Sequence, residues 1–354
     1  MADERIEAAV AHWAPRFVTN GVDPNDFQRV TAPLERWEEW LGAWVANGDL
    51  HATLAREAEE RGRTRTAGEA WVRAALSYHF AKFVWMVDMD RYRAAADRAV
   101  ATLREAHRLL DPAAERLEIP FEGTTMVGTL RRPPRVARPP LVFLLPGLDS
   151  TKEEFFDWEN VFLRRGMSTL SLDGPGQGET GYTTRIRPDY EVAVAAALDH
   201  LAGRDDLDLG RVGAVGVSLG GYYAPRVAAF EPRVKAAVAI GGPYNFGECW
   251  SGLPGLTRHA FVHHSGAADE AEGEKRALEL DLGPVLPRLE APFLVIMGKL
   301  DRLIPWQQAE RVVAEAPKGE LVMYEHGNHV CNNIPYLYRP LAADWTAEQL
   351  ARVG

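Results

Sequence analysis

The sequence has few cysteines and no long apolar run. Only Cys249 and Cys331 occur among the 354 residues, which is too few for a disulfide framework and agrees with the reducing cytoplasm. No uninterrupted apolar stretch approaches the ~20 residues that a membrane-spanning helix needs. The acidic, amphipathic residues 1–5 do not resemble a signal peptide. We therefore expect a cytoplasmic protein without a membrane partner.

Positive charge is also in short supply. The chain has 40 Lys and Arg against 50 Asp and Glu, which gives a formal net charge of −10. This balance argues against nucleic acid or an anionic membrane surface as the main partner. The one basic cluster, residues 131–138, is broken by prolines, so we expect a solvated loop there. No spacing of ligand-type residues matches a closed metal site, and we expect neither a metal nor a cofactor.

The first part of the chain shows only the helical period. From about residue 3 to 110, apolar positions recur at three and four residues without strand-like alternation. The sequence therefore predicts an all-α accessory domain over residues 1–112. Trp40 and Trp44 mark one helical face, for which Gly48 offers a stop. His79, on a second helical unit, is a candidate for substrate binding, although aromatic stripes at helical spacing are more often core.

Beyond residue 112 the period changes, and residues 113–354 predict an α/β catalytic domain. Two alternating runs read as antiparallel strands, and six short apolar runs fit a sheet that is covered on both faces. Helical segments separate the apolar runs, so the sequence predicts a doubly wound, mostly parallel sheet. A long interval at about 244–290 is expected to form a cap over the site. The eight predicted strands are 116–121, 126–130, 141–145, 168–172, 212–217, 236–240, 293–297 and 321–324.

One glycine-rich turn in the predicted sheet carries a chemical signal. Residues 216–220 read Gly-Val-Ser-Leu-Gly, between the apolar run 212–215 and a helix-compatible segment. This pattern is typical of a nucleophile elbow, a tight strand-to-helix turn that lifts the serine hydroxyl above the sheet. Ser218 is therefore the predicted nucleophile, and a plain glycine-rich turn is the alternative.

A serine nucleophile needs a histidine as base and a carboxylate that orients the histidine. Where the serine lies on a nucleophile elbow, the carboxylate comes next along the chain and the histidine after it. Asp301 comes directly after the strand 293–297 and is the predicted acid. Its alternative role is the N-cap of the next helix. His326 and His329 both follow the last strand, and we prefer His329 because its loop can reach over the elbow.

The oxyanion that develops on an attacked carbonyl needs hydrogen-bond donors. One expected donor is the backbone N–H of Leu219, the residue after the nucleophile. The second is the backbone N–H of Leu148, because Gly147 lets the loop after strand 141–145 turn this amide inward. The glycine-rich stretch 173–178 lacks the lysine of a Walker loop, and we interpret it as a structural turn.

These motifs together resemble the α/β-hydrolase superfamily. Residues 147–154, 173–179, 218–221 and 327–329 are similar to those of the 2,6-dihydroxypseudooxynicotine hydrolase group, which also contains fungal pigment hydrolases that shorten polyketide chains. The helical residues 68–71 are similar too, so the resemblance covers nearly the whole chain.

The resemblance implies a triad of Ser218, Asp301 and His329, a homodimer, and cleavage of a carbon–carbon bond next to a ketone. In the 2,6-dihydroxypseudooxynicotine hydrolase group the resemblance also implies a functional glutamate in the cap. Here Glu248 is the candidate for that role, although its spacing from Trp250 does not match cleanly. Both residues are candidates for substrate binding.

The predicted function is hydrolysis of a 1,3-diketone-like, aromatic or polyketide-type small molecule by a retro-Claisen route. Nothing local to the triad decides whether the leaving atom is carbon, oxygen or sulfur. A carboxylesterase or thioesterase, and acyl transfer or cyclisation in a biosynthetic pathway, are therefore alternatives. A non-catalytic binding protein on a hydrolase scaffold is a third reading. His329 activating water directly is an alternative to attack by Ser218.

Overall fold

The computed structural model describes residues 3–353. Residues 1 and 2, part of the N-terminal stretch analysed above, lie outside this range, as does residue 354. Contacts divide the chain into two compact units. The first comprises Met1–Ala114 with Glu153–Asp157, and the second comprises Glu115–Lys152 with Trp158–Gly354.

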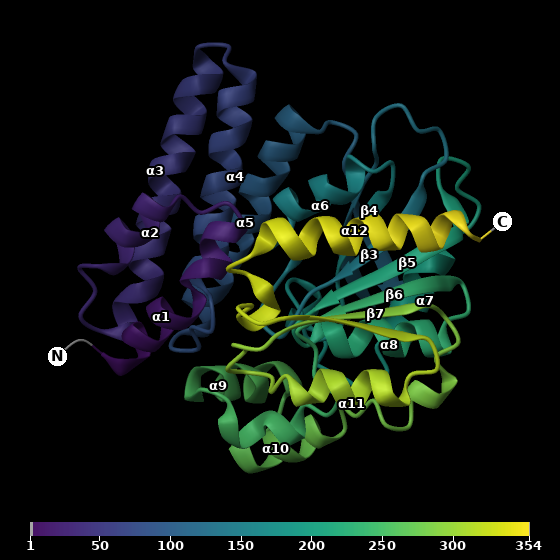
Figure 1. Cartoon of the computed structure of the whole chain (residues 1–354). Coiled ribbons are helices and arrows are strands. Elements are labelled where there is room, and N and C mark those ends of the chain that lie inside the picture. The colour runs from purple at the N-terminus through teal and green to yellow at the C-terminus, as the bar shows by residue number, and fades with distance from the viewer. Residues whose placement is uncertain (1–2, 354) are drawn as a thin grey trace. The chain divides into compact units, whose positions relative to one another are not determined.

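The elements of the first unit up to residue 114 are helical (Figure 1). Its aromatic side chains form a core, in which Phe17 stacks on Phe80 with ring centroids 3.8 Å apart. Asp3, Asp23 and Asp88 accept the first free backbone N–H groups of three helices, as N-caps do. The elements are α1 (Glu4–Thr19), α2 (Pro24–Thr31), η1 (Trp37–Glu39), α3 (Trp40–Glu60), α4 (Thr64–Ala81) and α5 (Met89–Leu110).

Gly48 does not end its helix, so the expected stop at this position is wrong. Helix α3 continues from Trp40 to Glu60. A Cβ atom at Gly48 would lie 2.3 Å from the ring of Tyr78 in α4. The missing side chain therefore allows α4 to pack closely against α3. A sequence pattern alone does not separate this use of glycine from its use as a helix terminator.

The second unit contains an eight-stranded sheet in the order β1-β2-β4-β3-β5-β6-β7-β8. β1 pairs antiparallel with β2, and β2 with β4, whereas all other neighbours are parallel. This confirms the predicted mostly parallel α/β sheet. The strands are β1 (Glu115–Phe121), β2 (Thr124–Arg131), β3 (Pro140–Leu145), β4 (Ser168–Asp173), β5 (Asp208–Val217), β6 (Val234–Ile240), β7 (Phe293–Gly298) and β8 (Gly319–Tyr324).

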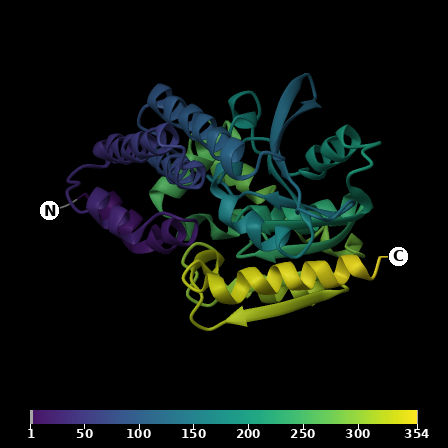
Figure 2. The same ribbon diagram turned by 90° about the horizontal axis from the view of Figure 1, so that it is seen from above.

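Helices cover both faces of this sheet (Figures 1 and 2). A Cβ at Gly213 of β5 would meet Thr346 of α12, whereas one at Gly216 would meet the start of α8. Residues three apart in a strand point to opposite faces, so α12 and α8 lie on opposite sides. The flanking helices are α6 (Phe156–Leu163), α7 (Glu191–His200), α8 (Gly220–Phe230), α11 (Gln307–Glu315) and α12 (Pro335–Ala351).

The interval expected as a cap consists of short helices. Its rings pack on one another: Phe261 lies 5.1 Å from Phe246 and 5.7 Å from Trp250, between centroids. The elements are η4 (Gly247–Gly252), α9 (Gly255–Ser265), α10 (Glu270–Leu278) and η5 (Leu286–Arg288). The remaining short 3₁₀ turns are η2 (Lys152–Glu154), η3 (Thr180–Tyr182) and η6 (His329–Cys331).

Part of the basic cluster is not a solvated loop, which corrects the expectation. Arg131 belongs to β2 and is only 4% exposed. Its guanidinium pairs with the buried carboxylate of Glu159 at 2.9 Å. The buried partner explains why an arginine is accepted there, since a buried charge needs a counterion.

None of the helices that the structure describes combines the length and the apolar character needed to cross a bilayer.

We expect Gly48→Ala to destabilise the helical unit by about 1–2 kcal/mol. The new methyl group would overlap the ring of Tyr78, whose hydroxyl is held by Asp49 at 2.9 Å. Overpacking of this kind costs about 1–3 kcal/mol and outweighs the helix propensity that alanine gains. Thermal or urea unfolding measures the change.

Gly42→Ala in the same helix is the matched control. A Cβ at Gly42 would meet only the flexible end of Arg91, at 3.6 Å. We expect this variant to be neutral or slightly stabilising. Equal effects of the two substitutions would contradict the steric argument.

Candidate active site

The turn at Ser218 requires glycine on both sides. Ser218 has a φ of +55°, a left-handed conformation that is uncommon for a residue with a side chain. A Cβ at Gly216 would lie 1.8 Å from the carbonyl oxygen of Gly220, and one at Gly220 would lie 2.2 Å from that of Leu145. The turn between β5 and α8 therefore has the geometry of a nucleophile elbow and not of an ordinary glycine-rich loop.

Side chains that follow three different strands meet at this turn. His329 Nε2 lies 2.9 Å from Ser218 Oγ, and His329 Nδ1 lies 2.7 Å from Asp301 Oδ2. The Asp301 side chain is fully buried and that of His329 is 9% exposed. A carboxylate can only accept, so Nδ1 carries the proton that faces Asp301 and Nε2 is free to accept from the serine hydroxyl.

The other oxygen of Asp301 is held by the backbone. Oδ1 accepts the N–H groups of Leu303 at 2.8 Å and Ile304 at 3.0 Å. The alternative role as N-cap of the next helix does not apply, because α11 begins at Gln307 with Trp306 at the cap position. These hydrogen bonds aim the second oxygen at the imidazole.

His329 is held by a short closed loop, whereas His326 is exposed. The backbone N–H of Asn328 donates to Asn333 Oδ1 at 2.9 Å, and the N–H of Asn333 donates back to Asn328 Oδ1 at 3.2 Å. Sequence reasoning missed Asn333. A second asparagine shortly after the histidine was the available signal, since asparagine side chains commonly bond to nearby backbone in loops.

The two expected oxyanion donors lie in loops beside the serine. A Cβ at Gly147 would be 3.0 Å from Ser218 Cβ and 3.4 Å from its Oγ, so the loop carrying Leu148 passes directly against the nucleophile. Within residues 3–353, neither the N–H of Leu148 nor that of Leu219 donates a hydrogen bond. Both amides therefore have free donor capacity next to a nucleophilic hydroxyl.

The structure does not give Glu248 and Trp250 the expected role in substrate binding. Glu248 points outward, 42% exposed, and its carboxylate bonds to Arg311 at 3.0 Å and Gln308 at 2.9 Å on α11. Trp250 is 5% exposed, and its ring packs edge-on against Phe261 of α9. The side chains of both residues are engaged by neighbouring helices: Glu248 by α11 and Trp250 by α9.

His79 is also a structural residue, which corrects the expectation that it binds substrate. It is fully buried in the helical unit, and its Nε2 lies 3.1 Å from Glu154 Oε2. Arg16 and Asn20 donate to the same carboxylate at 2.6–2.7 Å. Burial lowers the pKa of His79. Although burial raises the pKa of Glu154, Arg16 and His79 outweigh this and hold it well below its usual range.

The two cysteines are free and buried. The pKa of each thiol is raised to about 12. Burial is the main cause, and the negative charge of Asp301 raises the pKa further. A thiol with this pKa has almost no thiolate at neutral pH, so neither residue is a competing nucleophile.

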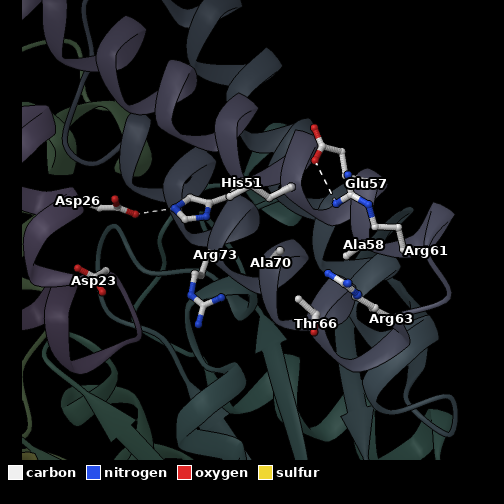
Figure 3. Close-up of a pocket in the computed structure, with 11 residues that line it drawn as sticks. Asp23, Asp26, His51, Glu57, Ala58, Arg61, Arg63, Thr66, Ala70 and Arg73 are labelled. Atoms are coloured by element: carbon white, nitrogen blue, oxygen red, sulfur yellow. Dashed lines mark hydrogen bonds and ion pairs between the residues drawn. The ribbon is translucent and has the colours of Figure 1, made fainter.

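A separate pocket of about 500 Å³ lies within the helical unit (Figure 3). His51 and Asp26 face each other there, with Nε2 and Oδ2 2.5 Å apart. Three acidic side chains and three arginines line the pocket, so it favours neither anions nor cations. None of the predicted site residues lines it.

Comparison with known proteins finds that this chain is similar to hydrolases. The esterase FrsA-like family matches residues 28–246, and the prolyl oligopeptidase family matches residues 154–351. The 2,6-dihydropseudooxynicotine hydrolase of Paenarthrobacter nicotinovorans is 33% identical over 97% of this chain and 93% of that protein. The crystal structure of a 2,6-dihydroxy-pseudo-oxynicotine hydrolase covers 95% of both chains with a TM-score of 0.87 and 32% identity.

Fungal relatives are similar over a shorter region. An α/β-hydrolase of Xenoacremonium sinensis is 34% identical over 63% of this chain and 56% of its own length. The chain thus spans little more than half of this fungal relative.

We expect Asp301→Asn to lower turnover of p-nitrophenyl acetate by about 10³–10⁴-fold. Asn keeps an oxygen for the N–H groups of Leu303 and Ile304, so the loop remains folded. Its amide would present a donor to His329 Nδ1 and thereby move the imidazole proton to Nε2, where it blocks proton transfer from the serine. Wild-type turnover in a folded variant would exclude Asp301 as the orienting acid.

Glu248→Gln should leave the same turnover within about twofold, because the carboxylate faces α11 on the surface and exposed ion pairs contribute little. Steady-state kinetics and a melting curve check this. A tenfold loss of turnover with unchanged stability would show that Glu248 reaches the substrate after all.

Proposed function

The chain belongs to the α/β-hydrolase superfamily, and from this premise we propose that it hydrolyses a carbon–carbon bond next to a ketone through Ser218. The observation that carries the proposal is the hydrogen-bonded chain from Ser218 Oγ through His329 to Asp301, with spacings of 2.9 and 2.7 Å. This arrangement is the one that activates a serine hydroxyl for attack on a carbonyl.

In the first step His329 Nε2 takes the proton of Ser218 as Oγ bonds to the substrate carbonyl carbon. Asp301 stabilises the imidazolium that forms. The carbonyl oxygen becomes an oxyanion, which the N–H groups of Leu219 and Leu148 bind. Preorganised donors of this kind are worth about 3 kcal/mol each in the transition state.

In the second step the tetrahedral intermediate collapses and the carbon–carbon bond breaks. The leaving carbanion is stabilised as an enolate by the neighbouring ketone, and His329 returns its proton to it. Water, deprotonated by His329, then attacks the acyl-serine. His329 returns this proton to Ser218 Oγ as the carboxylic acid leaves. One water is consumed and no cofactor takes part. Direct activation of water by His329 is the alternative first step, in which no acyl-serine forms.

A 1,3-diketone carrying an aromatic or polyketide-type group is the substrate class we propose. Support comes from the Paenarthrobacter relative, whose similarity extends over the helical unit as well as the sheet. Ester hydrolysis is the second candidate, because the esterase FrsA-like family matches a region that includes Ser218. Acyl transfer or cyclisation would use the same three side chains, but a nucleophile other than water would take the acyl group from Ser218.

The proposal includes a cytoplasmic location and a homodimer. The two free thiols support a reducing compartment. The dimer rests on the family resemblance, and sedimentation or light scattering of the purified chain tests it.

The decisive experiment compares 1-phenyl-1,3-butanedione with p-nitrophenyl acetate. We expect a higher kcat/KM for the diketone, because the proposed leaving group is an enolate. In ¹⁸O-labelled water the acid product should carry the label, because water releases the acyl group. Ser218→Ala should abolish both reactions and the labelling by a fluorophosphonate. Mass spectrometry after rapid quench should find an acyl group on Ser218.

Turnover of the ester alone would replace the proposal with an esterase. An unlabelled product formed with an added acceptor would indicate acyl transfer. Unchanged activity and labelling in Ser218→Ala would remove the serine mechanism altogether.

A further inference from the structure

The glycine-rich stretch after β4, interpreted above only as a structural turn, contacts the loop that carries Leu148. Within this stretch Gln177 is 1% exposed. Its Nε2 donates to the carbonyl oxygens of Pro146 at 2.7 Å and Gly147 at 2.9 Å. Its Oε1 accepts the backbone N–H of Gly174 at 3.0 Å and the hydroxyl of Tyr190 at 2.8 Å. All four hydrogen-bonding positions of the amide are used.

These partners permit only one orientation of the Gln177 amide. Backbone carbonyls can only accept hydrogen bonds, so they must face the NH₂ group. The N–H of Gly174 can only donate, so it must face the oxygen. A flipped amide would lose hydrogen bonds on both sides in a fully buried place, which costs about 1–3 kcal/mol per unsatisfied group.

The hydrogen bond to Gly147 constrains the neighbouring amide through the peptide plane. The Gly147 carbonyl and the Leu148 N–H belong to one planar trans peptide and point in opposite directions. A donor that holds the carbonyl therefore also sets the direction of the N–H. Since Gly147 lies against Ser218, this is the amide next to the nucleophile.

The far end of the same loop is held by the first residue of the glycine-rich stretch. Asp173, fully buried, accepts the backbone N–H of Lys152 and its Nζ, both at 2.8 Å. A Cβ at Gly178 would lie 2.0 Å from the Asp173 carboxylate, which explains a glycine there. Residues 173–178 thus hold the loop from Pro146 to Lys152 at both ends.

We propose that Gln177 is a positioning residue that aims the Leu148 N–H at the oxyanion, with Tyr190 fixing the Gln177 amide. The inference rests on the proposed function, because it presumes that an oxyanion forms at Ser218. Gln177 does not touch the substrate. Its effect belongs to the transition state, in which the negative charge on the carbonyl oxygen is greatest.

The test is Gln177→Met, which keeps length and shape and removes every hydrogen bond of the amide. Gln349→Met in α12 is the matched control, since Gln349 is also buried. Both are assayed with p-nitrophenyl acetate, with active sites counted by fluorophosphonate labelling. We expect Gln177→Met to lower kcat about 10–100-fold with KM within threefold, because a misaimed donor loses part of the 10²–10³-fold that a deleted one costs.

The pH profile of Gln177→Met should keep its shape, because the pair of His329 and Asp301 is untouched. Tyr190→Phe retains the ring, which stacks on Tyr223 at 4.0 Å, and removes one of two bonds to the Gln177 oxygen. We expect a smaller fall in kcat, about threefold. Gln349→Met should match the wild type in kcat and KM.

A kcat of Gln177→Met within twofold of the wild type overturns the inference. So does an equal loss in Gln349→Met, because it would indicate general destabilisation. If Gln177→Met does not fold, Tyr190→Phe decides, and an unchanged kcat then overturns the inference. Failure of the proposed function is a different result, in which Ser218→Ala itself retains activity.

Discussion

The left-handed backbone at Ser218 is the constraint on which the site depends. A strand that turns into a helix within two residues brings the backbone of 216, 220 and 145 within contact distance of one another. Only glycine fits at the first two positions, and Ser218 accepts a φ of +55° because its surroundings leave no other path. The strain places a hydroxyl at the tip of the turn, next to the histidine.

Hydrogen bonds that are each local to one loop align the remaining groups with that hydroxyl. Asp301 is oriented by two N–H groups of its own loop, and His329 by the reciprocal pair of Asn328 and Asn333. Each loop follows a different parallel strand, and the carboxyl ends of parallel strands lie at one edge of a sheet. The sheet thus sets the approximate position of each side chain, and the loop contacts set its direction.

The loop from Pro146 to Lys152 is also held by hydrogen bonds, but here the partners come from a different segment of the chain. Its two ends are held by side chains from another part of the chain: Gln177, in the turn after β4, binds the carbonyls of Pro146 and Gly147, and Asp173, the last residue of β4, binds Lys152. An amide side chain that satisfies two carbonyls in a fully buried place confers rigidity, because any displacement leaves polar groups unpaired. Rigidity at this loop is what a preorganised oxyanion site requires.

Local pattern was sufficient for the sheet, the elbow and the order of Ser218, Asp301 and His329, because each of these follows from periodicity and from a residue's place at a strand end. Tertiary packing decided the rest. Glu248, Trp250 and His79 have residue types suited to substrate binding, yet neighbouring helices engage their side chains. Gly48 serves a helix contact and not a helix end, and Gln177 received no role from its glycine-rich context. The physical reason is common to these cases: sequence spacing specifies the backbone conformation and the face of an element, whereas the partner of a side chain depends on segments far away in the chain.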